Sequence, residues 1–186
     1  MRTCLILALL MSTWSASAFA QSRPDQPRTE LDQLLTALPM APNEETASRM
    51  ESRIAMLWLK SGGPAVGLLL SHGTRNLENK EADEALQDFD AALALEPNLA
   101  EAYGRRALAR YQAGDVTGAV QDLEETLRRE PRHFGAWRTL SSIAEAQGHY
   151  AGALAAWKKL LEVDPKTPDG AKHLKELTRL AEGDDS

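Results

Sequence analysis

A spacing of 34 residues recurs through the middle of the chain, and this repeat constrains the fold more than any other feature of the sequence. Three blocks of this length align without gaps, at residues 66–99, 100–133 and 134–167. Each block carries a small residue, a bulky apolar residue and a proline at matching positions. The matching sets are Ala85, Ala119 and Ala153; Phe89, Leu123 and Trp157; and Pro97, Pro131 and Pro165. Repeats of roughly 20 to 50 residues stack, because one unit alone cannot bury its apolar face, so we expect an array rather than a globule.

The residues inside each block favour helices. Alanine and leucine dominate, whereas aromatic and β-branched residues are sparse. The small residues let the two helices of a repeat approach closely, and the bulky residues fill the space to the next repeat. Each proline follows a second helix, which it cannot extend, and Gly114 and Gly148 mark turns inside a repeat. The predicted fold class is therefore all-α.

These columns resemble the tetratricopeptide repeat, whose pattern is a large residue, a Leu-Gly pair, a later Ala-x-x-x-Phe and a closing proline. The last block is the most similar, with Trp137, Leu140-Ser141, Gly148, Ala153, Trp157 and Asp164-Pro165. The second block departs from the Leu-Gly pair with Arg106 and Ala107, and the first departs with His72 and Asn76. The resemblance implies a right-handed superhelical solenoid of antiparallel helix pairs, with three repeats over residues 64–167.

Two shorter helices are predicted before the repeats, within residues 29–63. Thr29 is placed to cap a first helix that ends before Pro39, and Asn43 is placed to cap a second. The glycines at positions 62 and 63 end that helix. Because neither helix fits the 34-residue columns, we expect N-terminal capping helices, or a decayed repeat, that cover the open end of the stack.

Residues 168–182 are predicted to form a C-terminal capping helix. Leucines on its inner face would pack on the last repeat, while lysine, glutamate and arginine face solvent, as the end of a repeat array requires. The acidic residues 183–186 form a short tail that we expect to fray.

The first 20 residues have the features of a secretory signal peptide. Arg2 supplies the positive charge, residues 4–11 form a short apolar stretch, and Ala18-Phe19-Ala20 offers a cleavage site. Residues 21–28 then form a polar, proline-bearing leader that we expect to be flexible. The protein is therefore expected to be exported, to the periplasm given its composition. The alternative is an uncleaved N-terminal anchor; no later segment has the roughly 20 apolar residues of an integral membrane span.

Charge and cysteine content exclude several functions. The net charge is −6, and losing Arg2 with the signal peptide would make the chain more acidic, so nucleic acid is not an expected partner. Cys4 is the only cysteine and would be removed, which leaves no thiol for catalysis or metal binding. The four histidines are scattered, and no catalytic, nucleotide or haem motif is present. We therefore expect a binding scaffold without cofactor or metal, and not an enzyme.

In the family that the repeats resemble, the first helices of successive repeats line a concave groove that binds a peptide or partner helix. Carried onto this chain, the groove is predicted to be apolar at the first two repeats and basic towards the last. The candidate partner-binding residues are Leu77, Arg105, Leu108, Tyr111, Arg138, Ser142 and Lys172. The basic residues would hold an acidic segment or C-terminal carboxylate of a protein or peptide partner, since arginine offers bidentate geometry.

Two alternatives to this groove remain open. Arg105 and Arg138 can instead pair with nearby acids such as Glu101 and Glu145 and hold no ligand, and Leu108 and Tyr111 can instead fill the core if the helix register is shifted by one residue. The lysine and asparagine clamp of chaperone-binding members is not expected, because Gly104, Leu108 and Ser142 occupy its places.

A second functional hypothesis is a self-associating component of an envelope assembly. The leucines of the first helix, Leu31, Leu34, Leu35 and Leu38, would then join a second copy. The sequence also leaves open whether the N-terminal segment occupies the chain's own groove.

Overall fold

The computed structural model describes residues 29–183; the predicted signal peptide, the leader at 21–28 and residues 184–186 of the tail lie outside the described residues. Within that range the chain is built of helices joined by short turns, with no strand, and the predicted all-α class is confirmed. The first part contains α1 (Glu30–Ala37), a short 3-10 helix (Leu38–Met40) and α2 (Glu44–Lys60). Thr29 and Asn43 cap α1 and α2 as predicted, accepting hydrogen bonds from the backbone N–H groups of Asp32 and Thr46.

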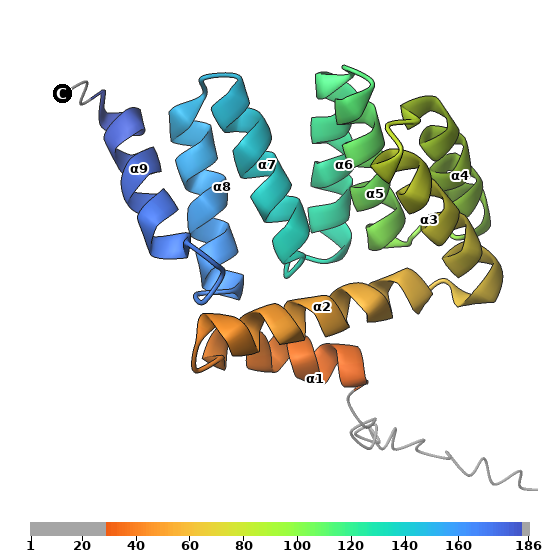
Figure 1. Ribbon diagram of the computed structural model, residues 1–186, viewed down its shortest axis with the longest axis horizontal. Coiled ribbons are helices and arrows are strands. Elements are labelled where there is room, and N and C mark those ends of the chain that lie inside the picture. The colour runs from red at the N-terminus through yellow and green to blue at the C-terminus, as the bar shows by residue number, and fades with distance from the viewer. Residues whose placement is uncertain (1–28, 184–186) are drawn as a thin grey trace, which may run out of the picture.

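The three predicted repeats are three helix pairs that stand side by side (Figure 1). They are α3 (Gly63–Glu78) with α4 (Ala82–Leu95), α5 (Ala100–Gln112) with α6 (Val116–Arg129), and α7 (Phe134–Ala146) with α8 (Tyr150–Val163). The last helix, α9 (Gly170–Glu182), lies along α8 and fixes it through a hydrogen bond of 3.0 Å from Trp157 Nε1 to the Gly170 carbonyl.

The alanine column lies where the two helices of each repeat meet. Ala85, Ala119 and Ala153 are each 0% exposed. Gly73 of α3 belongs to the same contact, because its Cα faces the ring of Phe89 on α4 with no room for a side chain. Small residues thus bring the helices of a pair close together, as the sequence indicated.

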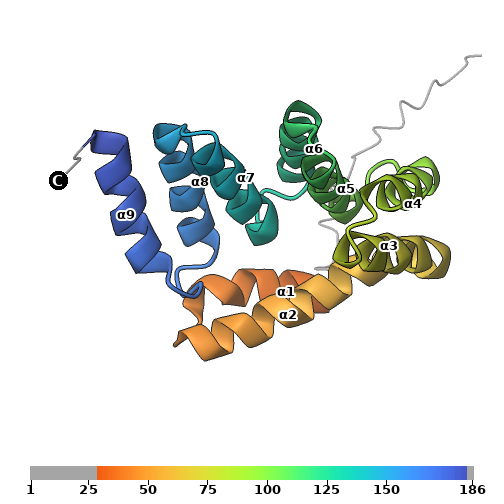
Figure 2. The same cartoon turned by 45° about the horizontal axis from the view of Figure 1, so that its top comes forward.

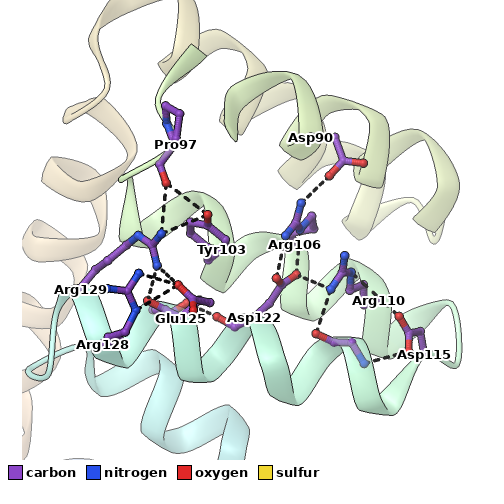
Figure 3. A network of polar contacts seen from close by, with 12 residues as sticks. Asp90, Pro97, Tyr103, Arg106, Arg110, Asp115, Asp122, Glu125, Arg128 and Arg129 are labelled. Carbon is purple, nitrogen blue, oxygen red and sulfur yellow. Dashed lines mark hydrogen bonds and ion pairs between the residues drawn. The ribbon is translucent and has the colours of Figure 1, made fainter. Parts of the chain in front are cut away.

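The polar residues that depart from the repeat pattern form hydrogen bonds with aspartates on the neighbouring helices. Arg106 donates two hydrogen bonds, of 2.8 and 2.7 Å, to the buried Asp122 of α6 and a third, of 2.7 Å, to Asp90 of α4 (Figure 3). These hydrogen bonds raise the pKa of Arg106 above its ordinary value, and the bonding to Asp122 makes the largest contribution. In the preceding repeat, His72 and Asn76 both bind Asp88 of α4, at 2.7 and 2.9 Å. Asp88 and Asp122 are 34 residues apart, so each polar first helix has a carboxylate at the same place on its second helix.

A second polar contact joins consecutive repeats. Arg129 of α6 lies over the ring of Tyr103, 4.1 Å from its centroid, and donates hydrogen bonds to the Tyr103 hydroxyl and the Pro97 carbonyl (Figure 3). Glu125 binds Arg129 and Arg128 from the next turn of α6. The loop that ends the first repeat is thereby fixed to the second.

The N-terminal helices do not take the place that the sequence suggested. After α2, the chain bends by 118° into α3, and α1 and α2 run back across the array, beneath α5 and α7, to α8 (Figures 1 and 2). We call residues 29–60 the strap. Instead of covering the open end at α3 and α4, the strap packs on the third repeat. The expectation of a terminal cap is therefore wrong.

One apolar cluster joins the strap to the third repeat. Its buried members are Leu35, Leu38, Ala41, Ala47, Ile54 and Trp58 of the strap with Phe134, Ala153, Trp157, Leu160 and Leu177. At the bend itself Leu68 remains 68% exposed. An amphipathic helix must bury its apolar face, but its own sequence does not say against which repeat.

No single helix among the described residues has the length and hydropathy of a membrane span; α2 and α3 meet that test only together, across their bend.

The close contact at Gly73 gives a stability prediction. A Cβ at this position would lie 2.7 Å from Phe89 Cε1, so we predict that Gly73→Ala lowers the free energy of unfolding by about 1 to 3 kcal/mol. Gly152→Ala on α8 is the matched control, because its Cβ would meet its nearest atom at 3.9 Å, and it should raise that free energy by about 0.5 to 1 kcal/mol. Urea unfolding measures both, and a stabilised Gly73→Ala would contradict this packing.

Candidate functional site

Four of the seven predicted site residues lie around one hollow between the first two repeats. Leu77 of α3 and Arg105, Leu108 and Tyr111 of α5 line it, together with Thr74, Glu78 and Gln112. The hollow is shallow, with a volume of about 490 Å³. Leu108 and Tyr111 are 36% and 39% exposed, so large apolar side chains face solvent where the family resemblance placed the groove. We call this the α3–α5 hollow.

Arg105 is at the hollow but is already paired. Its Nε donates a hydrogen bond of 2.6 Å to Oε1 of Glu101, one turn earlier on α5, and Glu101 is only 3% exposed. Burial alone would raise the pKa of Glu101, but hydrogen bonds and charges from His133 and Arg105 outweigh it and hold that pKa below its ordinary value. The carboxylate thus stays ionised and neutralises Arg105, which is the alternative that the sequence left open.

His133 is a buried residue whose role the sequence did not reveal. Its Nδ1 accepts the backbone N–H of Ala136 at 3.0 Å, which caps α7, so the ring donates through Nε2 to Glu101, also at 3.0 Å. The ring of Trp58, on the strap, stacks flat on it, with centroids 4.1 Å apart and planes 2° apart. A continuous line of contacts therefore runs from Trp58 through His133 and Glu101 to Arg105.

A sequence signal for His133 exists in the 34-residue register. Its column contains Leu99 in the first repeat and Thr167 after the last. A column that changes from leucine to histidine and threonine indicates that a polar partner lies beside it, and His133 and Thr167 are both buried in the structure. The partners are Glu101 for His133 and Arg138 for Thr167.

Arg138 does not belong to a free basic cluster. Its Nη2 donates to Oε1 of Glu51, on the strap, at 2.6 Å and to the hydroxyl of Thr167 at 2.7 Å. Oε2 of Glu145, which the sequence suggested as a partner, instead lies 3.2 Å from Nε2 of His173. The structure therefore corrects both the predicted free arginine and its predicted partner, because Glu51 comes from a segment 87 positions away.

The remaining two candidates lie apart from the hollow. Ser142 is exposed on α7 and donates a hydrogen bond of 3.1 Å to the Arg138 carbonyl one turn earlier. Lys172 is on α9, where it lines a separate open depression with His173, Glu176 and other residues of that helix. Arg105, Arg138 and Lys172 thus occupy three different surroundings, and the predicted basic end of the groove does not form as one patch.

The surroundings of the site contain no metal centre within residues 29–183, where no three His, Cys, Asp or Glu side chains gather as ligands. The arrangement instead offers exposed apolar side chains at the α3–α5 hollow and paired charges around it. This chemistry suits the binding of another polypeptide.

Comparison with known proteins defines the class of this fold and then its family. The chain is 31% identical over 170 residues to a TPR repeat-containing protein of Rhizobium etli, which covers 87% of this chain and 83% of that protein. The Sgt2 TPR domain from Aspergillus fumigatus has a TM-score of 0.60 and 26% identity, over 66% of this chain and 82% of that chain. The first TPR of Spaghetti (RPAP3), bound to the HSP90 peptide SRMEEVD, has a TM-score of 0.57 at 16% identity, over 62% and 91%. These likenesses define an array of tetratricopeptide-type helix pairs.

The family model described as tetratricopeptide repeat matches residues 70–125 and 105–171, which is more than half of the chain. The chain belongs to the tetratricopeptide repeat family.

Proposed function

We propose that this protein is an exported scaffold that binds a segment of another protein through the α3–α5 hollow. The observation that carries the proposal is the pair of exposed large side chains, Leu108 and Tyr111, on the first helix of the second repeat, beside Leu77. Exposed aromatic and aliphatic side chains at a concave surface are typical anchors for a partner. A solved neighbour of the same fold, the first TPR of RPAP3, holds a peptide.

The charges around the hollow favour an apolar partner side chain over a carboxylate. Glu101 neutralises Arg105, and Glu78 adds a negative charge at the rim. An acidic segment or C-terminal carboxylate, the partner suggested by the sequence, would have to displace Glu101 from Arg105 or Glu51 from Arg138. The partner segment is therefore proposed to insert a leucine-like or aromatic side chain between Leu77 and Tyr111.

A second candidate function is association between copies of this chain. It is supported by Leu68 and Met56, which are 68% and 46% exposed and line a hollow of about 590 Å³ at the α2–α3 bend. The route through the first helix is less favourable, since Leu35 and Leu38 are already buried against the third repeat.

The partner proposal predicts a position-specific cross-link. A photoreactive benzoylphenylalanine at Tyr111 should form an adduct with a partner protein in living cells, because the side chain faces the hollow. The matched control is the same group at Leu95 on α4, which is 58% exposed and lies outside the hollow. The adduct should disappear when Leu108→Asp is added, a substitution of an exposed residue that should change stability by only about 0.5 kcal/mol.

Adducts of equal yield and identity from both positions would contradict the α3–α5 hollow as the binding surface. An adduct of twice the chain's mass, formed with a second copy, would favour self-association instead.

Export predicts a shortened chain in the periplasm. Arg2, the apolar residues 4–11 and Ala18-Phe19-Ala20 support the proposal. In a Gram-negative host, the protein released by osmotic shock should begin at Gln21 when its mass and N-terminal sequence are measured. Ala18→Leu and Ala20→Leu together should block cleavage, since the peptidase requires small residues there. A full-length chain that stays in the cytoplasmic fraction would refute export.

A further inference from the structure

The strap is held on the third repeat by a polar cluster as well as by its apolar face. Glu51 of α2 meets Arg138 of α7 at 2.6 Å, and Arg138 also donates to the hydroxyl of Thr167. Asp164, which ends α8, lies against the same Glu51 and is 0% exposed. The cluster therefore joins the strap to the start of α7 and the end of α8 in one place.

The charges in this cluster do not balance when every acid is ionised. Two carboxyl groups, of Glu51 and Asp164, face one guanidinium, that of Arg138. Lys166 supplies only its backbone N–H, at 3.3 Å from Oδ1 of Asp164. The other oxygen, Oδ2, is buried and has no hydrogen-bond partner. One proton shared between the two carboxyl groups supplies the missing donor and removes the excess negative charge.

The raised pKa of Asp164 lies in the neutral range. Burial, followed by the Glu51 carboxyl, raises the pKa of Asp164 to about 7 from its ordinary 3.8. An acid whose pKa is raised by folding stabilises the folded contact fully below its ordinary pKa, and that contribution is lost as the pH rises through the raised value. The contact of strap and third repeat is therefore weakest above about pH 7.

The contact between Trp58 and His133 determines which surface is exposed when the strap is released. Trp58 covers His133, and a small pocket of about 90 Å³ connects His133 with Leu108 at the rim of the α3–α5 hollow. The strap end near Trp58 thus lies beside the surface proposed to bind a partner. If Trp58 leaves His133, the exposed surface extends from the hollow onto α7.

We propose that the strap is a proton-dependent gate: it docks on the third repeat while Glu51 and Asp164 share one proton, and it lifts when both are ionised. Lifting exposes His133 and Phe134 and enlarges the surface open to a partner segment. Only this last step rests on the proposed function, because docking and release of the strap are properties of the chain alone. The docked form binds one more proton than the lifted form between the ordinary pKa of Asp164 and its raised value of about 7. Over that range the ratio of lifted to docked strap rises about tenfold per pH unit, and above it the ratio levels off.

The gate is tested with 5-fluorotryptophan incorporated into the chain and ¹⁹F spectra recorded from pH 5.5 to 9. The Trp58 signal, assigned with Trp58→Phe, reports stacking on His133. We expect the Trp58 signal to move towards that of the lifted form as the pH rises to about 7 and to change little above it. The signal of Trp157 should change over the same range, because Trp157 lies in the apolar cluster that the strap covers. In Asp164→Asn the Trp58 signal should remain that of the docked form at every pH.

Two further variants keep the result interpretable. Glu51→Gln retains a hydrogen-bond acceptor for Arg138 but removes the carboxyl pair, so it should also stay docked if Asp164→Asn fails to fold. Asp169→Asn, an exposed acid of the same loop, is the matched control and should titrate like the unmodified chain.

Two results would overturn the gate. One is a Trp58 signal that does not change with pH; the other is an unchanged pH dependence in both Asp164→Asn and Glu51→Gln, which would place the responsible proton outside this carboxyl pair. The cross-link from Tyr111 separates the two proposals. A gate without any Tyr111 adduct would refute the partner proposal alone. An adduct whose yield does not rise between pH 5.5 and about pH 7 would refute the enlargement of the binding surface.

Discussion

The contact between the two helices of each repeat is the constraint on which this structure depends. Small residues, namely Ala85, Ala119, Ala153 and Gly73, let the helices meet without a gap, and a period of 34 residues brings that contact back in register. A stack built in this way is open along its length, because each repeat packs only on its neighbours. The array therefore has apolar surface left over at its ends and along one edge. What covers that surface decides which part of the molecule is available to a partner.

In this chain the strap covers mainly the third repeat, while the α3–α5 hollow of the first two repeats stays open. Apolar residues of α1 and α2 bury Phe134 and Trp157, while Glu51 binds Arg138 and Trp58 stacks on His133. The strap thus uses, within one molecule, the aromatic and ionic contacts that a helical partner would make. The α3–α5 hollow stays open beside the strap, with Leu108 and Tyr111 exposed and with Arg105 already neutralised by Glu101. The position of the strap therefore determines how much of this surface a partner can contact.

The sequence predicts the repeats well because their signals are local: the alanine and proline columns, the caps at Thr29 and Asn43, and the leucines of α9. The family resemblance, carried along the 34-residue columns, places Leu77, Leu108 and Tyr111 on the groove side of the first helices, where the structure has the hollow. Prediction from the sequence fails where a side chain's partner is remote. The sequence around Arg138 contains no sign of Glu51, its partner 87 positions away. The amphipathic pattern of α2 predicts that one face is buried, but not that it packs on the third repeat. His72 and Arg106 depart from the family pattern, and the sequence alone does not show that they contact Asp88 and Asp122 on the second helices of their repeats.

Hydrogen exchange in α2 tests the docking of the strap most directly. A lone amphipathic helix of 17 residues is only marginally stable in water, so protection of the amides at Glu44–Lys60 requires tertiary packing. At pH 6 we predict that these amides exchange as slowly as those of α7, and that Phe134→Asp accelerates α2 while leaving α5 and α6 protected. Exchange of α2 within seconds in the unmodified chain, alongside protected repeats, would contradict the docked strap and with it the division of the surface into a covered and an open part.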